Sequence, residues 1–506
     1  MGNSQVKRWA FILSPDKIFL PLAIAYGIVF LLITPPFQAP DEPNHFYRAY
    51  QISEGRLTPV KQLPPVLNPD QIAEREREVR DLRNSLAKGD SEAVLKESQD
   101  LKYTGGIGGY LPESLGTTAK AFFRLLNQEN RQNVRDIFPL LTLPLNRDNR
   151  LFVHFPNTAL YSPIPYLPQA FGIALGKISH FSPLVLMYLG RIANLFIWIV
   201  LVHLSIKITP VCKWLFFLLA LMPMSLFQAA SLSADSFTNG IAFLLISVFL
   251  RYAFDESSGS QISTIAIFVI SLLLSLSKQA YFLMPLLFLL IPVEKIGTKR
   301  KFYASFLLLY LLTVSVILLW TLVADVYKDI YKLYNAVIPT FSAEKQTLYI
   351  VSHPLQYCKI VVMTFIQNGR FCMDSFIGQL GWLDTGLPEL FRVSYIVMLF
   401  FAVLSGSRES IIFSLKQRSI ILATVLLSIL AISTLAFIGW TPVGSRIINV
   451  QGRYFIPVSP LFFLLFYKRK ISLNLNGSCA QLALVCYSLF CLTYTACVII
   501  KRYYIV

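Results

Sequence analysis

Long runs of apolar residues dominate the chain, and short segments that carry Lys and Arg separate them. Most runs approach the roughly 20 residues that an α-helix needs to cross about 30 Å of hydrocarbon. The pattern therefore predicts an all-α polytopic membrane protein with about 11 transmembrane helices, within a range of about 11 to 13. The predicted spans are residues 18–37, 183–206, 213–230, 236–254, 262–277, 279–293, 302–324, 391–405, 418–440, 454–467 and 478–500.

Residues 161–178 are also apolar, but Pro163, Pro165 and Pro168 interrupt them. We expect an interfacial or re-entrant helix here, because one more span would move the basic loops to the outside. With the N-terminus in the cytoplasm, every short cytoplasmic loop carries at least one base. Lys501 and Arg502 fall outside and are a minor exception. The cytoplasmic bases are Lys207, Lys213, Arg251, Lys295, Lys299, Arg300, Lys301, Arg408, Lys416, Arg418, Lys468, Arg469 and Lys470.

The spans divide the chain into five parts with two large outer loops. Residues 1–37 form the cytoplasmic N-terminus and a retained first transmembrane helix, and residues 38–182 form an extracytoplasmic loop with amphipathic and interfacial helices. Residues 183–324 form the transmembrane core, residues 325–390 the second extracytoplasmic loop, and residues 391–506 the C-terminal transmembrane helices.

Three features of the outer loops have structural interpretations. Ile72, Val79, Leu82 and Leu86 recur at helical spacing among charged residues, which predicts a solvated amphipathic helix. The glycine-rich run 105–109 lacks the spacing of a nucleotide-binding loop, so we expect a flexible turn. In the second loop, the sequence does not decide whether Cys358 and Cys372 form a disulfide.

Composition and charge exclude several classes of protein. Only 14% of the residues are charged and 55% are hydrophobic, against about 25% charged in soluble domains. This excludes a soluble enzyme, a disordered chain and a secreted disulfide scaffold. Of the net charge of +17, none lies in residues 38–160, which hold 16 basic and 16 acidic residues. The excess of basic residues therefore lies in the membrane part of the chain, as the positive-inside rule predicts. We therefore expect no nucleic-acid partner.

Acidic, basic and amide groups collect at one predicted membrane face, the outer one. Asp41, Glu42 and His45 follow the first span, and Pro40 and Pro43 flank the two acids. No carboxylate or base lies near the middle of any predicted span, where ion-coupled carriers need one. The other polar residues predicted at or near this face are Tyr161, Arg191, Ser233, Asp235, Asn239, Lys278, Gln279, Asp384, Arg446, Gln451, Arg453 and Tyr454.

These groups suit transfer of a group from a lipid phosphate to an acceptor hydroxyl. Asp41 or Glu42 would accept the proton of the attacking hydroxyl. Arg453, Lys278 or Arg191 would hold the phosphate, and an apolar groove between helices would hold the lipid tail.

Each of these residues also has a structural interpretation. The acids at 41 and 42 could be boundary caps, and His45 could be a hydrogen-bonded structural histidine. Asp235 could be a helix N-cap, and Lys278 could extend to the interface. Arg446, Arg453 and Trp382 could be interfacial anchors.

Five motifs along the chain resemble those of a bacterial family of multi-pass proteins catalogued as a domain of unknown function. The order of a first span, an acidic pair and a large outer loop also resembles the GT-C glycosyltransferase superfamily. The motifs are Pro35-Pro36-Phe37-Gln38-Ala39-Pro40-Asp41-Glu42-Pro43-Asn44-His45-Phe46, Tyr161-Ser162-Pro163-Ile164-Pro165-Tyr166, Ser233-Ala234-Asp235, Gly381-Trp382-Leu383-Asp384 and Gln451-Gly452-Arg453-Tyr454-Phe455.

The resemblance implies a polyprenyl-phosphate-linked sugar donor and a glycan or lipid acceptor. Transfer would occur at the outer face of the bacterial cytoplasmic membrane, among membrane lipids. It implies that Asp41 is the base, with Glu42 as its neighbour; which of the two acts stays open. Some superfamily members bind a divalent metal through further acids, for which Asp235 and Asp384 are available here, but no cofactor is assigned. Two other classes stay open: a flippase for a lipid-linked glycan, and a non-catalytic envelope scaffold.

Overall fold

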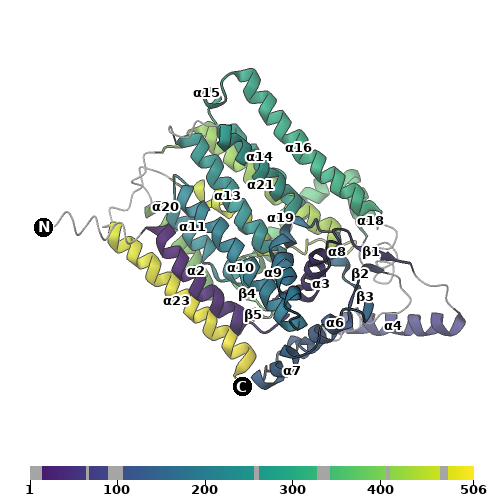
Figure 1. The fold of residues 1–506 in the computed structure, drawn as a ribbon. Helices are drawn as coiled ribbons and strands as arrows, with labels where there is room; N and C mark the ends of the chain where they lie inside the picture. The colour runs from purple at the N-terminus through teal and green to yellow at the C-terminus, as the bar shows by residue number, and fades with distance from the viewer. Residues whose placement is uncertain are drawn as a thin grey trace.

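Long apolar helices form the body of the protein. The computed structural model describes residues 14–63, 68–88, 106–255, 261–326, 342–405, 411–467 and 477–505. Within these ranges six helices are long and apolar enough to cross a membrane, and each matches one predicted span. They run side by side along one common direction (Figure 1). The six are α2 (Pro15–Ile33), α10 (Pro183–Ile208), α13 (Ala234–Phe254), α16 (Lys299–Asp325), α21 (Leu415–Trp440) and α23 (Gly477–Tyr504).

The other five predicted spans are shorter or broken. Proline accounts for the breaks, since it removes a backbone donor and fits only the first turn of a helix. Pro223 starts a new helix within 213–230, Pro285 lies in a 3-10 segment of 279–293, and Pro457 lies in another within 454–467. Membrane crossing by these five segments remains a prediction. Their elements are α11 (Lys213–Ala220), α12 (Pro223–Ala229), α14 (Gln261–Ser277), η4 (Gln279–Tyr281), η5 (Met284–Leu290), α20 (Glu389–Ser405), η6 (Gly452–Val458) and α22 (Ser459–Leu464).

The first outer loop gathers at one end of the helix bundle, away from α15 (Val293–Ile296) at the other end (Figure 1). The predicted amphipathic helix is confirmed as α4 (Pro69–Lys88), and the interrupted apolar segment forms η3 (Ile164–Tyr166) and α9 (Leu167–Ile178). The remaining helical elements of this loop are α3 (Glu42–Ser53), α6 (Glu113–Lys120), η1 (Phe123–Leu126), η2 (Val134–Ile137), α7 (Phe138–Leu141) and α8 (Pro156–Ala159).

The glycine-rich run is a strand, so the predicted flexible turn is wrong. Its residues 106–109 lie within β2 (Gly106–Pro112), the central strand between β1 (Val60–Gln62) and β3 (Arg150–His154), and both pairings are antiparallel. A Cβ on Gly108 would lie 1.8 Å from the Val153 carbonyl oxygen. Glycine is therefore required by the close approach of the neighbouring strand.

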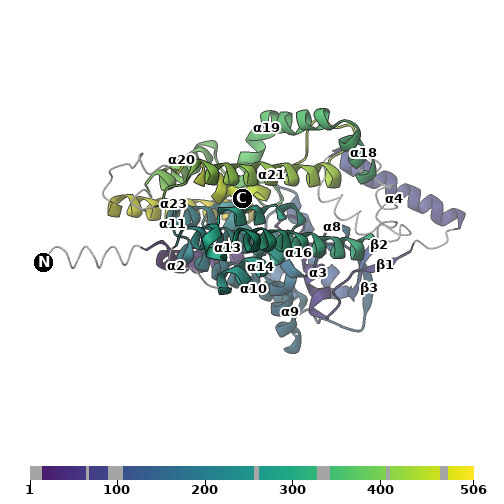
Figure 2. The same cartoon turned by 90° about the horizontal axis from the view of Figure 1, so that it is seen from above.

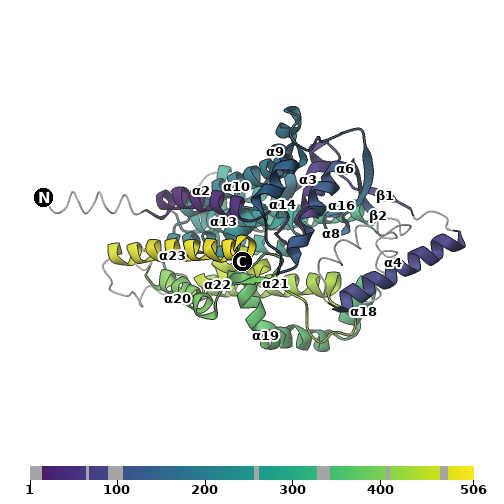
Figure 3. The ribbon, with the colours of Figure 1, turned by 90° about the horizontal axis from the view of Figure 1, so that it is seen from below.

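The second outer loop contains α18 (Ala343–Ser352), α19 (Pro354–Ile377) and a small hairpin of β4 (Gln379–Leu380) and β5 (Thr385–Gly386). α19 and α9 lie on opposite sides of the bundle (Figures 2 and 3). Cys358 and Cys372 are both free. They lie on the same helix, α19, about 21 Å apart along its axis, which is too far for a disulfide.

Two apolar cores hold these parts together. The larger lies among the long helices, and the smaller joins α3, the sheet and the start of α10 around Phe46, Tyr47 and Tyr166. The end of α23 is tied to the first outer loop, because the Gln132 backbone N–H donates to the Tyr503 carbonyl at 2.7 Å. The site described next lies where α3, α13 and η6 approach one another.

Candidate functional site

Asp41 lies in a tight turn between α2 and α3. Its backbone is left-handed, with φ of 60°, a conformation that Asp and Asn tolerate better than most residues. It occupies the N-cap position of α3, but its side chain makes no capping hydrogen bond. The carboxylate instead accepts a hydrogen bond of 2.8 Å from Nδ2 of Asn157, and Oδ1 of Asn157 accepts one of 2.7 Å from Nδ2 of Asn44.

Several charges act on the Asp41 carboxylate. Burial raises its pKa above the usual value, and Asp235 raises it further, whereas Arg453 and the Asn157 hydrogen bond lower it. Desolvation outweighs the favourable partners. A carboxylate with a raised pKa is a stronger base, which suits proton transfer nearer neutral pH.

Glu42, the other acid of the pair, forms a fully buried ion pair with Arg191 of α10. Nε of Arg191 donates to Oε1 at 2.8 Å and Nη2 donates to Oε2 at 2.6 Å, and both side chains have zero exposure. The Leu232 backbone N–H also donates to Oε1 at 3.0 Å. The remaining N–H groups of Arg191 donate to the backbone carbonyls of Leu31, Thr34 and Pro35. This bidentate pair therefore joins the end of α2 to α3 and α10.

Asp235 and Lys278 form a second ion pair, beside Asp41. Nζ of Lys278 donates to Oδ1 of Asp235 at 2.8 Å, and both side chains are 16% exposed. Gln228 donates to Oδ2 at 3.1 Å and accepts from Asn239 at 3.0 Å. The N-cap of α13 is Ser233, whose hydroxyl accepts from the Asp235 backbone N–H, so the N-cap interpretation of Asp235 is wrong.

Tyr454 receives two cations on its ring. Lys278 Nζ lies 4.2 Å and the Arg453 guanidinium carbon 5.3 Å from the ring centre. Arg453 is 6% exposed, and its buried Nε has no hydrogen-bond partner within the described ranges. The buried Oε1 of Gln451 is likewise without a partner there. Buried guanidinium nitrogens are normally hydrogen-bonded, so Arg453 leaves a donor available for an anion. Arg446 is exposed at the surface.

His45 is neutral at this site. Its Nδ1 lies 2.8 Å from the Tyr166 hydroxyl, and the two rings are 5.7 Å apart. Burial lowers its pKa to about 3, against the opposing effect of Asp235. The ring therefore acts as a neutral hydrogen-bonding group at physiological pH.

An apolar cavity of about 360 Å³ opens beside the charged groups. Lys278, Tyr161 and Tyr454 are among its polar lining residues, and much of its wall comes from α14, α16 and α21. The apolar and aromatic residues of this wall are Leu160, Leu276, Ala280, Tyr281, Trp320, Ala324, Ile432, Leu435, Ile438, Gly439 and Trp440.

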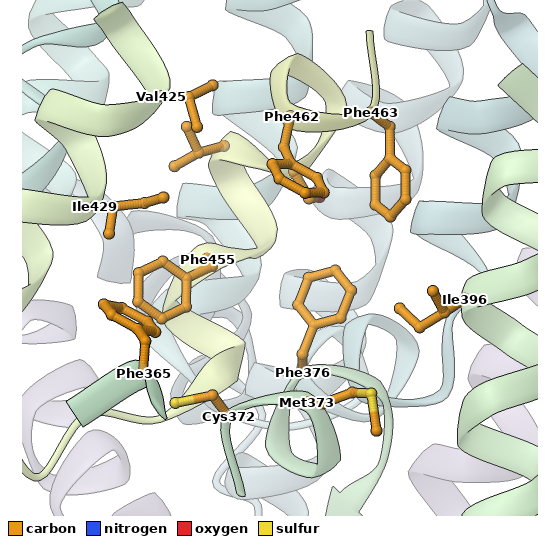
Figure 4. Close-up of a pocket in the computed structure, with 12 residues that line it drawn as sticks. Phe365, Cys372, Met373, Phe376, Ile396, Val425, Ile429, Phe455, Phe462 and Phe463 are labelled. Atoms are coloured by element: carbon orange, nitrogen blue, oxygen red, sulfur yellow. The ribbon is translucent and has the colours of Figure 1, made fainter. Parts of the chain in front are cut away.

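A second apolar cavity, of about 230 Å³, lies next to the first along η6. Phe455, the residue after Tyr454, points into it together with Phe365 and Phe376 of α19 and Phe462 (Figure 4). Its lining includes no charged residue. Consecutive residues of η6, Tyr454 and Phe455, therefore line different cavities.

Asp384 lies apart from this cluster. It accepts from Nε and Nη2 of Arg502 at 3.2 and 2.9 Å, so the base at the end of α23 has a partner in the second outer loop. Trp382 Nε1 donates to the Phe37 carbonyl at 3.0 Å, which ties this turn to the segment between α2 and α3. The described part of the chain contains no group of three or more His, Cys, Asp or Glu that could hold a metal. Asp235 and Asp384 are each paired with a base, so they do not fit a divalent ion.

The structure thus sorts the predicted site residues into three groups. Glu42 pairs with Arg191, and Asp384 pairs with Arg502. No sequence pattern predicted roles for Asn157, Asn44 or the aromatic wall of the cavity, because these roles depend on contacts between distant segments. The residues brought together are Asp41, His45, Tyr161, Asp235, Lys278, Gln451, Arg453 and Tyr454.

A polytopic chain with this composition is a membrane protein. Residues 24–462 match the family described as predicted membrane protein (DUF2142), and the chain belongs to this family. This confirms the resemblance to a family of unknown function. No curated protein and no solved structure matches the chain.

Proposed function

We propose that this protein is a membrane glycosyltransferase of the GT-C type. It transfers a sugar from a polyprenyl-phosphate donor to a glycan or lipid-linked acceptor at the outer face of the bacterial cytoplasmic membrane. The observation that carries the proposal is the position of Lys278. It lines an apolar cavity and pairs with Asp235 in the same cluster as Asp41 and Arg453.

Asp41 is the base in this proposal, and Glu42 holds the turn that presents it. The Glu42 carboxylate accepts two hydrogen bonds from Arg191 and one each from the backbone N–H groups of Leu232 and Ala39, the last at 3.4 Å. These fill its roughly four acceptor positions, so none is left for a substrate proton. Among the residues that the structure describes, the Asp41 carboxylate accepts a hydrogen bond from Asn157 alone, so it keeps acceptor capacity. Its raised pKa favours proton uptake.

Arg453 and Lys278 bind the donor phosphate. Lys278 has three N–H donors and uses one on Asp235, and the Nε of Arg453 has no partner within the described ranges. Both cations lie over the Tyr454 ring, which holds them in place without neutralising their charge. The cavity beside Lys278 takes the first isoprene units of the lipid.

The transfer step moves one proton and one electron pair. The acceptor hydroxyl oxygen bonds to the anomeric carbon, and its proton passes to the Asp41 carboxylate. The bond between the anomeric carbon and the phosphate oxygen breaks, and the electron pair leaves on that oxygen. The guanidinium of Arg453 and the ammonium of Lys278 stabilise the additional negative charge on the phosphate.

Membranes from cells that lack the gene and carry a plasmid copy test the proposal. They are supplied with a polyprenyl phosphate carrying a radiolabelled sugar, and label in envelope glycan is measured. Asp41→Asn should lower transfer at least about 100-fold. Asp148→Asn, which removes an exposed acid from the same loop, is the matched control. Equal transfer by the Asp41 variant would refute the assignment, and movement of labelled lipid across vesicles without transfer would favour a flippase.

A further inference from the structure

Helix α9 buries one face and exposes apolar side chains on the opposite face. One face packs against the protein through Gln169, Ile173 and Gly176. The other is solvent-accessible in this structure, with Leu167, Phe171, Leu175 and Ile178 at 48%, 64%, 51% and 75% exposure. At about 100° per residue these four side chains fall within an arc of about 80°. α9 contains no acidic residue.

A cluster of bases lies at the C-terminal end of this exposed stripe. Glu54 accepts both Nη atoms of Arg150, at 3.0 and 2.6 Å, which neutralises that arginine. Lys177 is 14% exposed, lies 3.9 Å from Glu54 and stacks 4.8 Å above the Tyr50 ring. Arg147 is exposed and donates to the Lys177 carbonyl from one Nη atom.

The charges of this cluster do not balance. Burial lowers the pKa of Lys177, and of its charged neighbours only Glu54 opposes this, whereas Arg147 and Arg150 add to it. Three cations thus share one carboxylate, and an additional anion would be stabilised between Arg147 and Lys177. This anion would lie at the end of an apolar stripe. A phospholipid has the same arrangement, because its charged headgroup adjoins its apolar acyl chains.

We propose that Arg147 and Lys177 bind the phosphate of an anionic phospholipid, while the exposed stripe of α9 lies among its acyl chains. The lipid thereby anchors the first outer loop to the membrane. α9 lies at the edge of the molecule, on the side opposite α19, so a lipid reaches it without displacing another described element (Figures 2 and 3). The proposal does not depend on the proposed catalytic activity.

Native mass spectrometry of the full chain in detergent tests this site. The protein is titrated with phosphatidylglycerol or phosphatidylcholine, and the dissociation constant of the tightest lipid is measured for each. Arg147→Gln with Lys177→Gln should weaken phosphatidylglycerol binding about 30-fold, at about 1 kcal/mol for each base. Phosphatidylcholine binding should stay within about twofold. The single variant Arg147→Gln changes only an exposed side chain and should weaken phosphatidylglycerol about fivefold.

Arg135→Gln with Arg446→Gln is the matched control, because it removes two exposed bases elsewhere. It should leave phosphatidylglycerol binding within about threefold. Unchanged binding by the Arg147 single variant would overturn the proposal, as would an equal loss in the control. Millimolar inorganic phosphate that displaced the lipid completely would also overturn it, because the site would then take a soluble anion. Phe171→Ser should weaken both lipids, and no effect on either would remove the apolar half of the proposal.

Discussion

Asn157 holds the carboxylate of Asp41 through a hydrogen bond of 2.8 Å, although the two residues lie 116 positions apart in the chain. Asn44, one turn into α3, fixes the amide of Asn157 from its other side at 2.7 Å. The orientation of the proposed base is therefore set by α8, which lies much later in the first outer loop. Asp41 is thus the residue proposed to act in the reaction, whereas Asn157 and Asn44 orient it.

Asn157→Ala should shift the pH dependence of transfer. The Asn157 hydrogen bond lowers the pKa of Asp41, so its loss raises that pKa. The base must be ionised, and the acidic limb of the pH–rate profile therefore moves to higher pH. The rate at the alkaline plateau should fall about tenfold, because the carboxylate is less well oriented. A lower plateau with an unmoved limb would mean that Asn157 only supports the loop; Asn149→Ala is a suitable control.

Asp41→Asn should abolish transfer and stabilise the folded protein. Because burial raises the pKa of Asp41, the folded chain keeps its proton at pH values where the unfolded chain has lost it. Stability therefore falls as pH rises through this window, and a neutral side chain removes the loss. Asn also suits the left-handed backbone at φ of 60°. The thermal midpoint should rise at pH 7 and converge with the parent below pH 3.8, the ordinary value. A lower midpoint at pH 7 would contradict the assignment.

Glu42→Gln should destabilise the protein, because it leaves the Arg191 guanidinium buried with zero exposure and no counter-charge. Breaking one partner of such a pair costs about 3–5 kcal/mol of unfolding free energy. Glu389→Gln is the matched control, since it breaks a pair with Arg370 in which both side chains are more than 60% exposed. It should cost at most about 1 kcal/mol. If Glu42→Gln folded as stably as the control but lost transfer, Glu42 rather than Asp41 would be the base.

Gly439→Phe should impair donor binding without impairing the chemistry. Gly439 lines the apolar cavity, and a Cβ placed there meets no atom within 4 Å, so an aromatic ring can enter the space of the lipid. KM for the polyprenyl-phosphate donor should rise about tenfold while kcat stays within about twofold. Gly369→Phe on α19 is the control, because a Cβ there is also unobstructed but the residue lies outside the cavity. Equal kinetics for the two variants would place the lipid elsewhere.

Gly108→Ala should disrupt the three-stranded sheet. The added Cβ would lie 1.8 Å from the Val153 carbonyl oxygen, so β2 and β3 would have to separate. We expect a loss of at least about 3 kcal/mol in unfolding free energy, or no folded protein. Gly116→Ala on α6 meets no atom within 4 Å and should be about 0.5–1 kcal/mol more stable than the parent. Normal stability for the Gly108 variant would mean that the strands can part at little cost.

The apolar pattern determined the long helices, because the length needed to cross a bilayer is a local property of the sequence. Six predicted spans are single helices that are long enough, and the amphipathic helix at 69–88 follows from its periodicity. The sequence also placed Asp41, Asp235, Lys278 and Arg453 at one predicted face, and the structure brings their side chains into one cluster.

The tertiary structure alone distinguished the two neighbouring acids. Asp41 and Glu42 are chemically similar and adjacent, and their environments differ because Arg191 reaches only Glu42, from 149 residues away. The tertiary structure likewise makes residues 106–109 of the glycine-rich run a strand. Backbone pairing with β1 and β3 holds them extended, and a run of glycines does not predict this from its sequence alone. Local patterns determine where the chain is apolar. Which buried charge finds a partner depends on contacts between distant segments, and these exist only once the chain has folded.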